Sequence, residues 1–477
     1  MPKRSVEVPF NTPPYQNVDG MVLDNFSETL FDGYIDELGN TNKRDGLKYH
    51  TNLGSFKKSE GAHWFENKNI ALFNSDGNIY KISDTLGTVT NITNSGDSIL
   101  SDGHAVFTDN GSDFIACNGG KMVYSNGTNN TAYITDSNAP QEVSHVAFLD
   151  YYLIANKIGT GQFYFANFLS TPITWSALDF QTAESLPDNI ISLYVVNRTI
   201  VVFGSSTIEF FQNDGISPFT RLNGTEINRG AMAKHSTVNV NGVLYFFDDK
   251  RRLCLLDGFT LRQINTSFDR VIQKFGTVSD CVASYEHFNG NDLIRFNFGT
   301  EKRTIVYHIQ NNYWVEDSYY DSSTNERQHY LGSCYIYAKE WNQHLVGSRF
   351  DGNVFLRDTE TFKDDSQQIR FKKVTGWIDH NIPDKKKISY SLTFRFKSGV
   401  GIGANKDVEP LATIRWRNDG NSKWSNYMHI KLKIKGQTEF VYKIFNLGCY
   451  FSRQYELTFS QDAPFILGKV TEEVQFD

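Results

Sequence analysis

The 477-residue sequence contains few cysteines, and none of them lies in a CxxC pair. They are odd in number and far apart, which supports neither a zinc knuckle nor a disulfide framework: Cys117, Cys254, Cys281, Cys334 and Cys449. The eleven histidines show no HxH, HxxxH or HExxH spacing, and no DxDxDG series indicates a calcium loop. We therefore expect neither a metal nor a cofactor.

Long apolar runs are also missing. No stretch of roughly 18 apolar residues occurs, and the N-terminal MPKRSVEVPFNTPPYQ has no apolar signal segment. We expect no membrane-spanning segment and no Sec-type secretion. The absence of a Walker-type phosphate loop argues against a DNA-packaging motor. The formal net charge of −7 argues against a basic DNA-wrapping surface, although it allows a protein that merely surrounds DNA.

Aromatic residues and turn formers are abundant, with 37 Phe, 24 Tyr and 36 Gly, which is typical of a β-rich protein with many turns. The stretch Ala183–Gly215 illustrates the pattern. The segments 190–196, 199–203 and 207–211 are apolar or β-branched, and two or three polar residues separate them. Such spacing predicts a compact antiparallel meander.

Similar units recur along most of the chain. They begin near residues 64, 104, 145, 190, 235, 281 and 335, about 40 to 54 residues apart. This period is close to the roughly 40–50 residues of a four-stranded propeller blade. A closed ring of blades buries their faces and removes most exposed edges. We therefore predict an all-β chain with a β-propeller of seven blades, six being the alternative.

The chain divides into three predicted parts. Residues 1–60 lack clean periodicity and contain prolines that force extended backbone, so we predict an N-terminal extended arm and docking segment. Residues 61–365 form the predicted propeller. From residue 366 the strands become longer and alternate between apolar and polar residues, which predicts a C-terminal β-sandwich over 366–477.

Three ordered groups of motifs carry a family resemblance. The first is 183–191 (AESLPDNII) followed by FGSSTIEFF, and the second is 229–236 followed by VNVNGVLYFFDD and 262–266 (RQINT). The third is C-terminal: ATIRW, 418–420 (NDG), 423–425 (KWS), KIFNLGCYFSRQYELTFS and 462–468 (DAPFILG). Together they resemble the packaged-DNA-stabilisation or tail hub proteins of short-tailed phages of the P22 kind. The C-terminal motifs are looser versions of the family pattern, and the resemblance covers roughly residues 140–475.

The resemblance implies a structural virion protein rather than an enzyme. It implies a tail hub, or nozzle, that forms a hexameric ring below the portal and adaptor proteins and assembles in the bacterial cytoplasm. Such a hub closes the head-to-tail channel, stabilises packaged DNA until genome ejection, and anchors tailspikes, fibres or a tail needle. Because each copy carries −7, we expect DNA to be retained sterically in the lumen, with no sequence-specific binding. Lys385, Lys386 and Lys387 are then expected to face neighbouring proteins or solvent.

Two alternatives belong to other functional classes. One is a glycan-binding or glycan-cleaving, sialidase-like propeller, and the other is a receptor-binding protein at the tail tip. A sialidase needs three arginines that converge on a carboxylate, whereas the arginines here are placed singly in turns and at strand ends. Asp419 to Trp424 resembles a degenerate Asp box, which is a folding device that presents its tryptophan to the core.

The family motifs supply structural or interface candidates rather than catalytic, cofactor or metal residues. Glu184, Asp188 and Glu209 could be interpreted as paired acids. We favour structural roles, with Glu184 bonding backbone donors between blades, Asp188 in a turn and Glu209 pointing out of an apolar strand. His235 is expected to satisfy a hydrogen bond in the core or a turn. The full candidate set is Glu184, Asp188, Gly204, Ser205, Ser206, Glu209, His235, Asp419 and Trp424.

Overall fold

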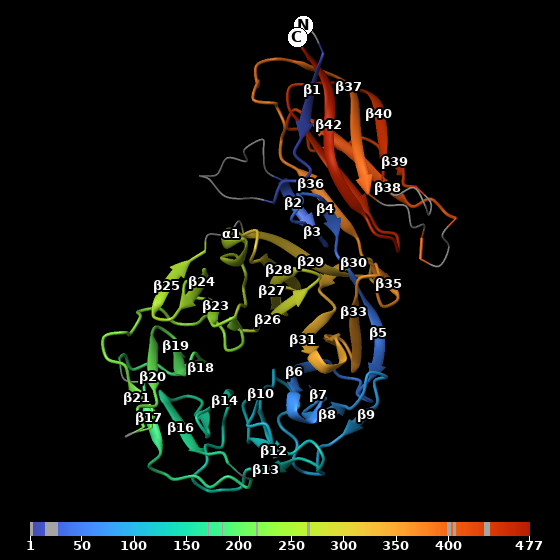
Figure 1. The fold of residues 1–477 in the computed structure, drawn as a ribbon. Helices are drawn as coiled ribbons and strands as arrows, with labels where there is room; N and C mark the ends of the chain where they lie inside the picture. The colour runs from blue at the N-terminus through green and yellow to red at the C-terminus, as the bar shows by residue number, and fades with distance from the viewer. Residues whose placement is uncertain are drawn as a thin grey trace.

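The fold is a ring of β-sheets that carries a β-sandwich at one side (Figure 1). The computed structural model describes residues 3–14, 27–169, 171–183, 185–215, 218–264, 268–397, 402–403, 407–433 and 439–477. The helical segments in these ranges are three short turns: η1 (Glu66–Lys68), α1 (Asp269–Ile272) and η2 (Lys339–Trp341). The predicted all-β class, a propeller followed by a sandwich, is confirmed.

Five blades are separate four-stranded antiparallel sheets whose strands follow one another in chain order. Between most neighbouring blades the first strands contact one another, so these strands line the centre of the ring. The first three blades consist of β6 (Ser59–Phe65), β7 (Ile70–Ser75), β8 (Asn78–Ile82) and β9 (Val89–Asn91); β10 (Val106–Asp109), β11 (Phe114–Cys117), β12 (Val123–Ser125) and β13 (Ala132–Tyr133); β14 (Val146–Leu149), β15 (Tyr152–Asn156), β16 (Gln162–Asn167) and β17 (Phe180–Thr182). Blades four and five consist of β18 (Ile190–Val196), β19 (Thr199–Gly204), β20 (Ile208–Gln212) and β21 (Thr220–Arg221); β22 (Val238–Val240), β23 (Val243–Phe247), β24 (Leu253–Asp257) and β25 (Thr260–Gln263).

The remaining two blades belong to larger sheets. Blade six has four strands of its own, and a fifth strand, β30, pairs with its outermost strand. Blade seven has three strands from the end of the propeller and one from near the N-terminus, β5, which pairs antiparallel with β33. These strands are β26 (Cys281–Phe288), β27 (Asn291–Phe298), β28 (Arg303–His308), β29 (Tyr313–Asp321) and β30 (Glu326–His329); β31 (Gly332–Ala338), β32 (Gln343–Ser348), β33 (Asn353–Asp358) and β5 (Gly46–Asn52). The seven blades that the repeat spacing predicts are therefore present.

Closure of the ring differs from the predicted division at residue 60. The last sequence unit supplies only three strands, so β33 would be an exposed edge without a fourth strand. β5, inside the predicted N-terminal arm, fills that place and holds both ends of the propeller together. Two short strands, β34 (Lys363–Asp364) and β35 (Gln367–Gln368), extend the same sheet beyond β5.

The C-terminal sandwich also takes strands from the N-terminal segment. One sheet runs β3-β4-β42-β37-β40, with β1 on β42, and the other runs β2-β36-β41-β38-β39. Strands from the N-terminal segment are β1 (Arg4–Val8), β2 (Ser27–Phe31), β3 (Gly33–Ile35) and β4 (Thr41–Lys43). Strands from the C-terminal segment are β36 (Phe371–Thr375), β37 (Lys387–Lys397), β38 (Leu411–Asn418), β39 (Met428–Lys431), β40 (Glu439–Tyr450), β41 (Arg453–Phe459) and β42 (Ile466–Phe476). Both chain ends consequently lie together at the far end of the sandwich (Figure 1).

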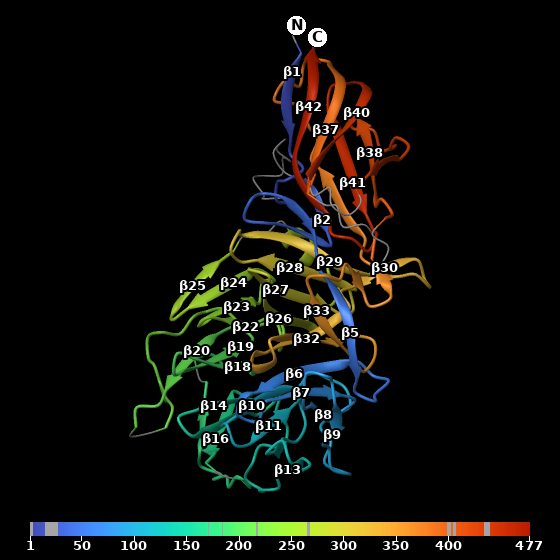
Figure 2. The same ribbon diagram turned by 45° about the vertical axis from the view of Figure 1, so that its right-hand side comes forward.

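Ring and sandwich are joined by a shared sheet and a shared core. β2 makes a parallel bridge to β29 of blade six, from Phe31 to Glu316, so the second sandwich sheet continues the blade (Figure 2). The core between the two sandwich sheets includes Phe394 and Leu457, and it extends to Val306 and Val315 of blade six. A continuous apolar core across this junction favours a fixed orientation of the two parts.

Candidate functional site

The first family motif forms the tight β19–β20 turn of blade four. The carboxylate of Asp188 accepts hydrogen bonds from the backbone N–H groups of Ser206 (2.8 Å) and Thr207 (3.1 Å). A Cβ atom on Gly204 would lie 2.3 Å from the same carboxylate, so only glycine leaves room for it. The structure thus brings Asp188 against Gly204 and Ser206 of this turn, where each has a structural contact.

The same turn also supports the entry to blade five. A Cβ atom on Gly230 would lie 2.1 Å from the carbonyl carbon and oxygen of Ser205, so Gly230 packs directly on this peptide. The backbone N–H of Ala231 donates to the carbonyl of Gly204 at 3.0 Å. The spacing between FGSS and the Arg229–Gly230 pair is therefore explained by contact between two blades.

Glu209 lies inside blade four, contrary to the expectation that it points out of the strand. Only 1% of its surface is exposed. One carboxylate oxygen accepts from the backbone N–H of Ser185 (2.9 Å), and the other pairs with the guanidinium of Arg221 (2.9 Å). The expectation was wrong because blade four packs against neighbours on both faces, so alternation along β20 does not reach solvent. Glu184, the other predicted acid, lies outside the described residues.

His235 lies at the centre of the ring in a group of three imidazoles. Its ring is 4.9 Å from that of His104 and 5.2 Å from that of His145. His145 is hydrogen-bonded on both nitrogens, to the hydroxyl of Ser144 (3.0 Å) and to the carbonyl of Lys234 (3.1 Å). Burial lowers the pKa of His104 to about 4 and that of His145 to about 3, so both rings are neutral at pH 7.

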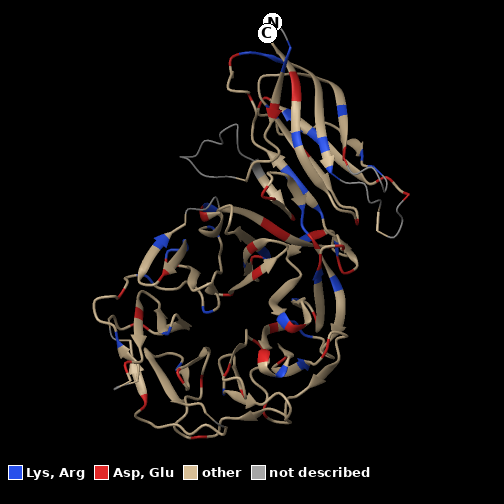
Figure 3. Ribbon diagram, viewed as in Figure 1, with Lys and Arg blue, Asp and Glu red and all other residues tan. Residues whose placement is uncertain are grey.

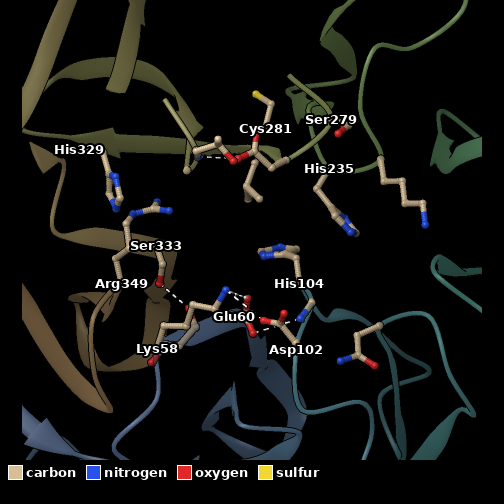
Figure 4. Close-up of a pocket in the computed structure, with 18 of the residues that line it drawn as sticks. Lys58, Glu60, Asp102, His104, His235, Ser279, Cys281, His329, Ser333 and Arg349 are labelled. Carbon is tan, nitrogen blue, oxygen red and sulfur yellow. Dashed lines mark hydrogen bonds and ion pairs between the residues drawn. The ribbon is translucent and has the colours of Figure 1, made fainter. Parts of the chain in front are cut away.

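A cavity of about 670 Å³ opens beside these imidazoles. It is lined by loop and strand-end residues of several blades, and Figure 4 shows the side chains around it. Arg349 of blade seven and His329 of blade six lie together on one side, and His104 and His235 lie across from them (Figure 4). No motif in the sequence marks this convergence, because the contributing residues are separated by up to about 290 positions.

The C-terminal family motif forms a turn on the sandwich. Asp419 adopts a positive φ of 55°, and its carboxylate accepts from the backbone N–H groups of Phe451 (2.7 Å) and Ser452 (2.9 Å). An Asp box would place its tryptophan in the core, but Trp424 does not enter the core. It is partly exposed, and the guanidinium groups of Arg415 and Arg417 lie 4.9 and 4.6 Å from its ring. This expectation was wrong because the core between the sheets is already filled by strand residues.

Charged side chains that sequence reasoning missed form a buried network where the ring meets the sandwich. Arg44 pairs with Asp32 (3.1 Å) and Asp364, and Arg295 pairs with Asp317 (3.0 Å) and Glu286. Arg357 of blade seven also pairs with Glu286. All of these residues are at most 9% exposed. The network therefore connects the N-terminal segment, blades six and seven and the link at residue 364.

The arginines keep two of these carboxylates ionised. Burial alone would raise the pKa of Glu286 and of Asp317, but the neighbouring guanidinium groups, Arg295 foremost, hold both pKa values below the usual range. The sequence did contain a signal for these charged residues, since Glu286 and Arg295 interrupt apolar strands. It could not indicate which residues pair, because the partners lie on different strands. Within the segments that the structure covers, no group of three or more His, Cys, Asp or Glu side chains is arranged to hold a metal ion.

The lysine run at 385–387 does not wholly face solvent. Lys386 is exposed and Lys385 half-buried, but Lys387 is fully buried. Its ammonium group donates to the carbonyls of Ile382 and Phe451. The expectation for Lys387 was wrong because it lies in β37, whose alternate side chains enter the sandwich.

In the described ranges there is also no helix long and apolar enough to span a membrane.

Comparison with known proteins identifies the family. Residues 36–361 match the family model described as "Bacteriophage P22 Gp10, beta-propeller", which covers more than half of the chain. The chain belongs to this family of phage stabilisation proteins. It is accordingly a structural component of a phage. No curated protein matches the sequence.

The solved structures that match this chain in a structural comparison have very different sequences. The extracellular domain of the one-component system BT4673 from B. thetaiotaomicron is 10% identical, with a TM-score of 0.43, over 95% of this chain and 64% of that one. YCF48 bound to D1 peptide is 11% identical, with a TM-score of 0.43, over 66% of this chain and 100% of that one. The N-terminal domain of Nup159 is 8% identical, with a TM-score of 0.40, over 69% and 98%. The chain thus spans about two thirds of the length of the BT4673 domain.

Proposed function

We propose that this phage structural protein is the tail hub, or nozzle, of a short-tailed phage. In this role it forms a ring, most simply of six copies, below the portal and adaptor proteins. The ring closes the head-to-tail channel, stabilises packaged DNA and anchors tailspikes, fibres or a tail needle. The observation that carries the proposal is the family match over residues 36–361. The C-terminal motifs that resemble the same family extend this support beyond the propeller.

The sandwich offers a surface for contact between copies. β40 ends its sheet, so within the described residues its outer backbone edge has no strand partner. Val441 and Phe445 on this strand are 55% and 63% exposed, although both are large and apolar. An unpaired edge with exposed apolar side chains is suited to association with another chain. We assign it to a neighbouring copy, because a repeated head-to-tail contact closes into a ring.

Retention of DNA is proposed to be steric. A channel wall that neutralised many phosphates would slow ejection, because each phosphate contact adds salt-sensitive affinity. The net charge of −7 per copy favours a wall that does not grip DNA. The ring then narrows the channel, and an attached plug or the hub's own loops close it below.

A density map of isolated tails tests the proposal. We expect a ring of this protein next to the adaptors, and we expect particles lacking the protein to lose their packaged DNA. A location at the tail tip with direct binding to a host glycan or protein would instead favour the receptor-binding alternative. Cleavage of a fluorogenic sialoside by the purified chain would favour the sialidase-like alternative.

A substitution separates ring contact from folding. We expect Phe445→Glu to prevent incorporation into tails and to leave the thermal unfolding midpoint of the free protein unchanged, because the side chain is exposed. Leu86→Glu is the matched control, since Leu86 is 86% exposed in the β8–β9 turn of blade one and not on β40. Normal incorporation of the Phe445→Glu protein would reject the β40 edge as the contact and leave the tail-hub role itself untouched.

A further inference from the structure

The cavity at the centre of the propeller has the size of a small-molecule site. Its volume of about 670 Å³ falls within the usual range for ligand pockets, roughly 300–1,000 Å³. The wall comes from both ends of the propeller sequence and from blades between them, so ring closure itself creates the site. Neither the tail-hub role nor the family description accounts for it.

Three cationic side chains line the cavity, of which Lys58 is ion-paired and Lys234 is exposed. Arg349 supplies the third. Its Nε donates to the carbonyl of Tyr330 (3.2 Å) and its Nη2 to the carbonyl of Gly332 (3.0 Å), which fix the orientation of the guanidinium. None of the described carboxylates lies within 4.0 Å of it, unlike the arginines of the buried network. Burial lowers its pKa to about 10, which still leaves it charged at pH 7. An oriented guanidinium without a carboxylate is suited to an oxyanion from outside.

His329 lies beside Arg349 and has unused hydrogen-bonding capacity. Both of its ring nitrogens are buried and have no hydrogen-bond partner among the described residues. The ring stacks on Phe350, with centroids 5.6 Å apart and planes at 18°, so its position is fixed. Leaving two buried polar atoms unpaired is costly, and a ligand in the cavity would pair at least one of them.

The acidic residues of the wall limit what can enter. Glu60 pairs with Lys58 at 2.6 Å, and Asp280 accepts the backbone N–H of Thr300 at 2.6 Å. These two carboxylates and that of Asp102 line the same cavity and repel a highly charged polyanion. The opposite wall offers the neutral imidazoles of His104 and His235, each with one donor and one acceptor nitrogen. This combination suits a compact molecule with one anionic group and further polar groups.

We propose that the central cavity binds a small molecule whose phosphate or carboxylate group is held by Arg349 and His329. The guanidinium donates to the oxyanion, and the imidazole N–H of His329 donates a further hydrogen bond. His104 and His235 face the remainder of the molecule. The site is independent of the proposed contact at β40, which lies on the sandwich.

Titration calorimetry on the full chain at pH 7 tests this proposal, with inorganic phosphate and malonate as the two oxyanion probes. We expect at least one probe to bind with one site per chain and to raise the thermal unfolding midpoint. Arg349→Gln should weaken binding by about tenfold or more, because the charge-assisted hydrogen bonds are lost. Arg198→Gln is the matched control: Arg198 is 75% exposed in the β18–β19 turn, away from the cavity, and should bind like the original protein.

A second variant keeps the test decisive if Arg349→Gln fails to fold. His329→Phe preserves an aromatic ring against Phe350 and removes both nitrogens, so it should fold and bind more weakly. Stronger binding of phosphate than of malonate would assign the site to phosphorylated molecules, and the reverse order to carboxylates. No binding of either probe at roughly 10 mM, or binding that both substitutions leave unchanged, would overturn the proposal.

Discussion

At the scale of single residues, the family motif in blade four is a packing solution. Gly204 has an ordinary φ, so glycine is required there by space and not by backbone conformation. We expect Gly204→Ala to destabilise the protein by about 1–3 kcal/mol, because its Cβ would collide with the carboxylate of Asp188. The thermal unfolding midpoint should fall by several degrees.

Two further variants test this explanation. In the double variant Asp188→Ala with Gly204→Ala, the clash is absent. The loss of stability in this variant should therefore be smaller than the sum of the losses in the two single variants. Gly276→Ala serves as the control, since its nearest neighbour would lie at 3.5 Å and its φ is also ordinary. Equal losses at Gly204 and Gly276 would contradict the steric argument.

A buried histidine makes stability depend on pH. The folded-state pKa of His145 is lowered to about 3, whereas an unfolded chain titrates histidine near 6.5. Between these values the unfolded state binds more protons, so stability falls as the pH drops below about 6.5. At pH 5 the loss from this residue is about 2 kcal/mol.

Unfolding midpoints at pH 7 and pH 5 measure this effect. The His145→Gln protein should lose less stability over that interval than the original protein. His287→Gln, at a side chain that is 63% exposed, should lose as much as the original. If His145→Gln and the original protein show the same drop between the two pH values, His145 is not responsible.

At the scale of elements, closure of the ring depends on β5. Leu47 on this strand is completely buried among Tyr330, Val346 and Phe355 of the last blades. Leu47→Ala should cost about 2–5 kcal/mol, because it leaves a cavity at the seam of the ring. Amide hydrogen exchange in β33 should accelerate, since β33 is the strand that β5 covers.

A second leucine provides the comparison. Leu38 is 79% exposed, so Leu38→Ala should change stability by no more than about 0.5 kcal/mol. Unchanged exchange in β33 after Leu47→Ala would mean that β5 does not secure the ring.

Strands and turns within a blade could be predicted from the sequence because their partners are adjacent in the chain. The first strands predicted near residues 104, 145 and 190 begin in the structure at Val106, Val146 and Ile190. β5 could not be found in this way, because its partner β33 is about 300 residues away and local patterns carry no information on such pairing. Glu209 and Trp424 were misassigned for a related reason: whether a strand face is covered depends on neighbouring elements, and alternation alone does not reveal them.

At the scale of the whole molecule, the buried charges determine how the ring and the sandwich stay together. Figure 3 shows acidic and basic residues gathered where the two parts meet. Arg44→Met would leave Asp32 and Asp364 buried without their main cation, at a cost of about 3–5 kcal/mol. We expect calorimetry to show the ring and the sandwich unfolding in separate transitions in this variant. Arg198→Met, which removes a largely exposed ion pair, should behave like the original protein, and a single unshifted transition in both would contradict this role for Arg44.

The charge distribution also predicts how the free chain treats DNA. Acidic and basic residues are interspersed around the ring, and the net charge is −7 (Figure 3). Lys387, one of three adjacent lysines, is buried and cannot contact phosphate. Because non-specific affinity depends on clustered cations that displace counterions, duplex DNA should bind more weakly than about 10⁻⁴ M at physiological salt. Fluorescence anisotropy with a labelled duplex measures this at low and physiological salt. Tight binding with a steep salt dependence would show that the protein grips phosphates, and retention by a steric ring would then have to be abandoned.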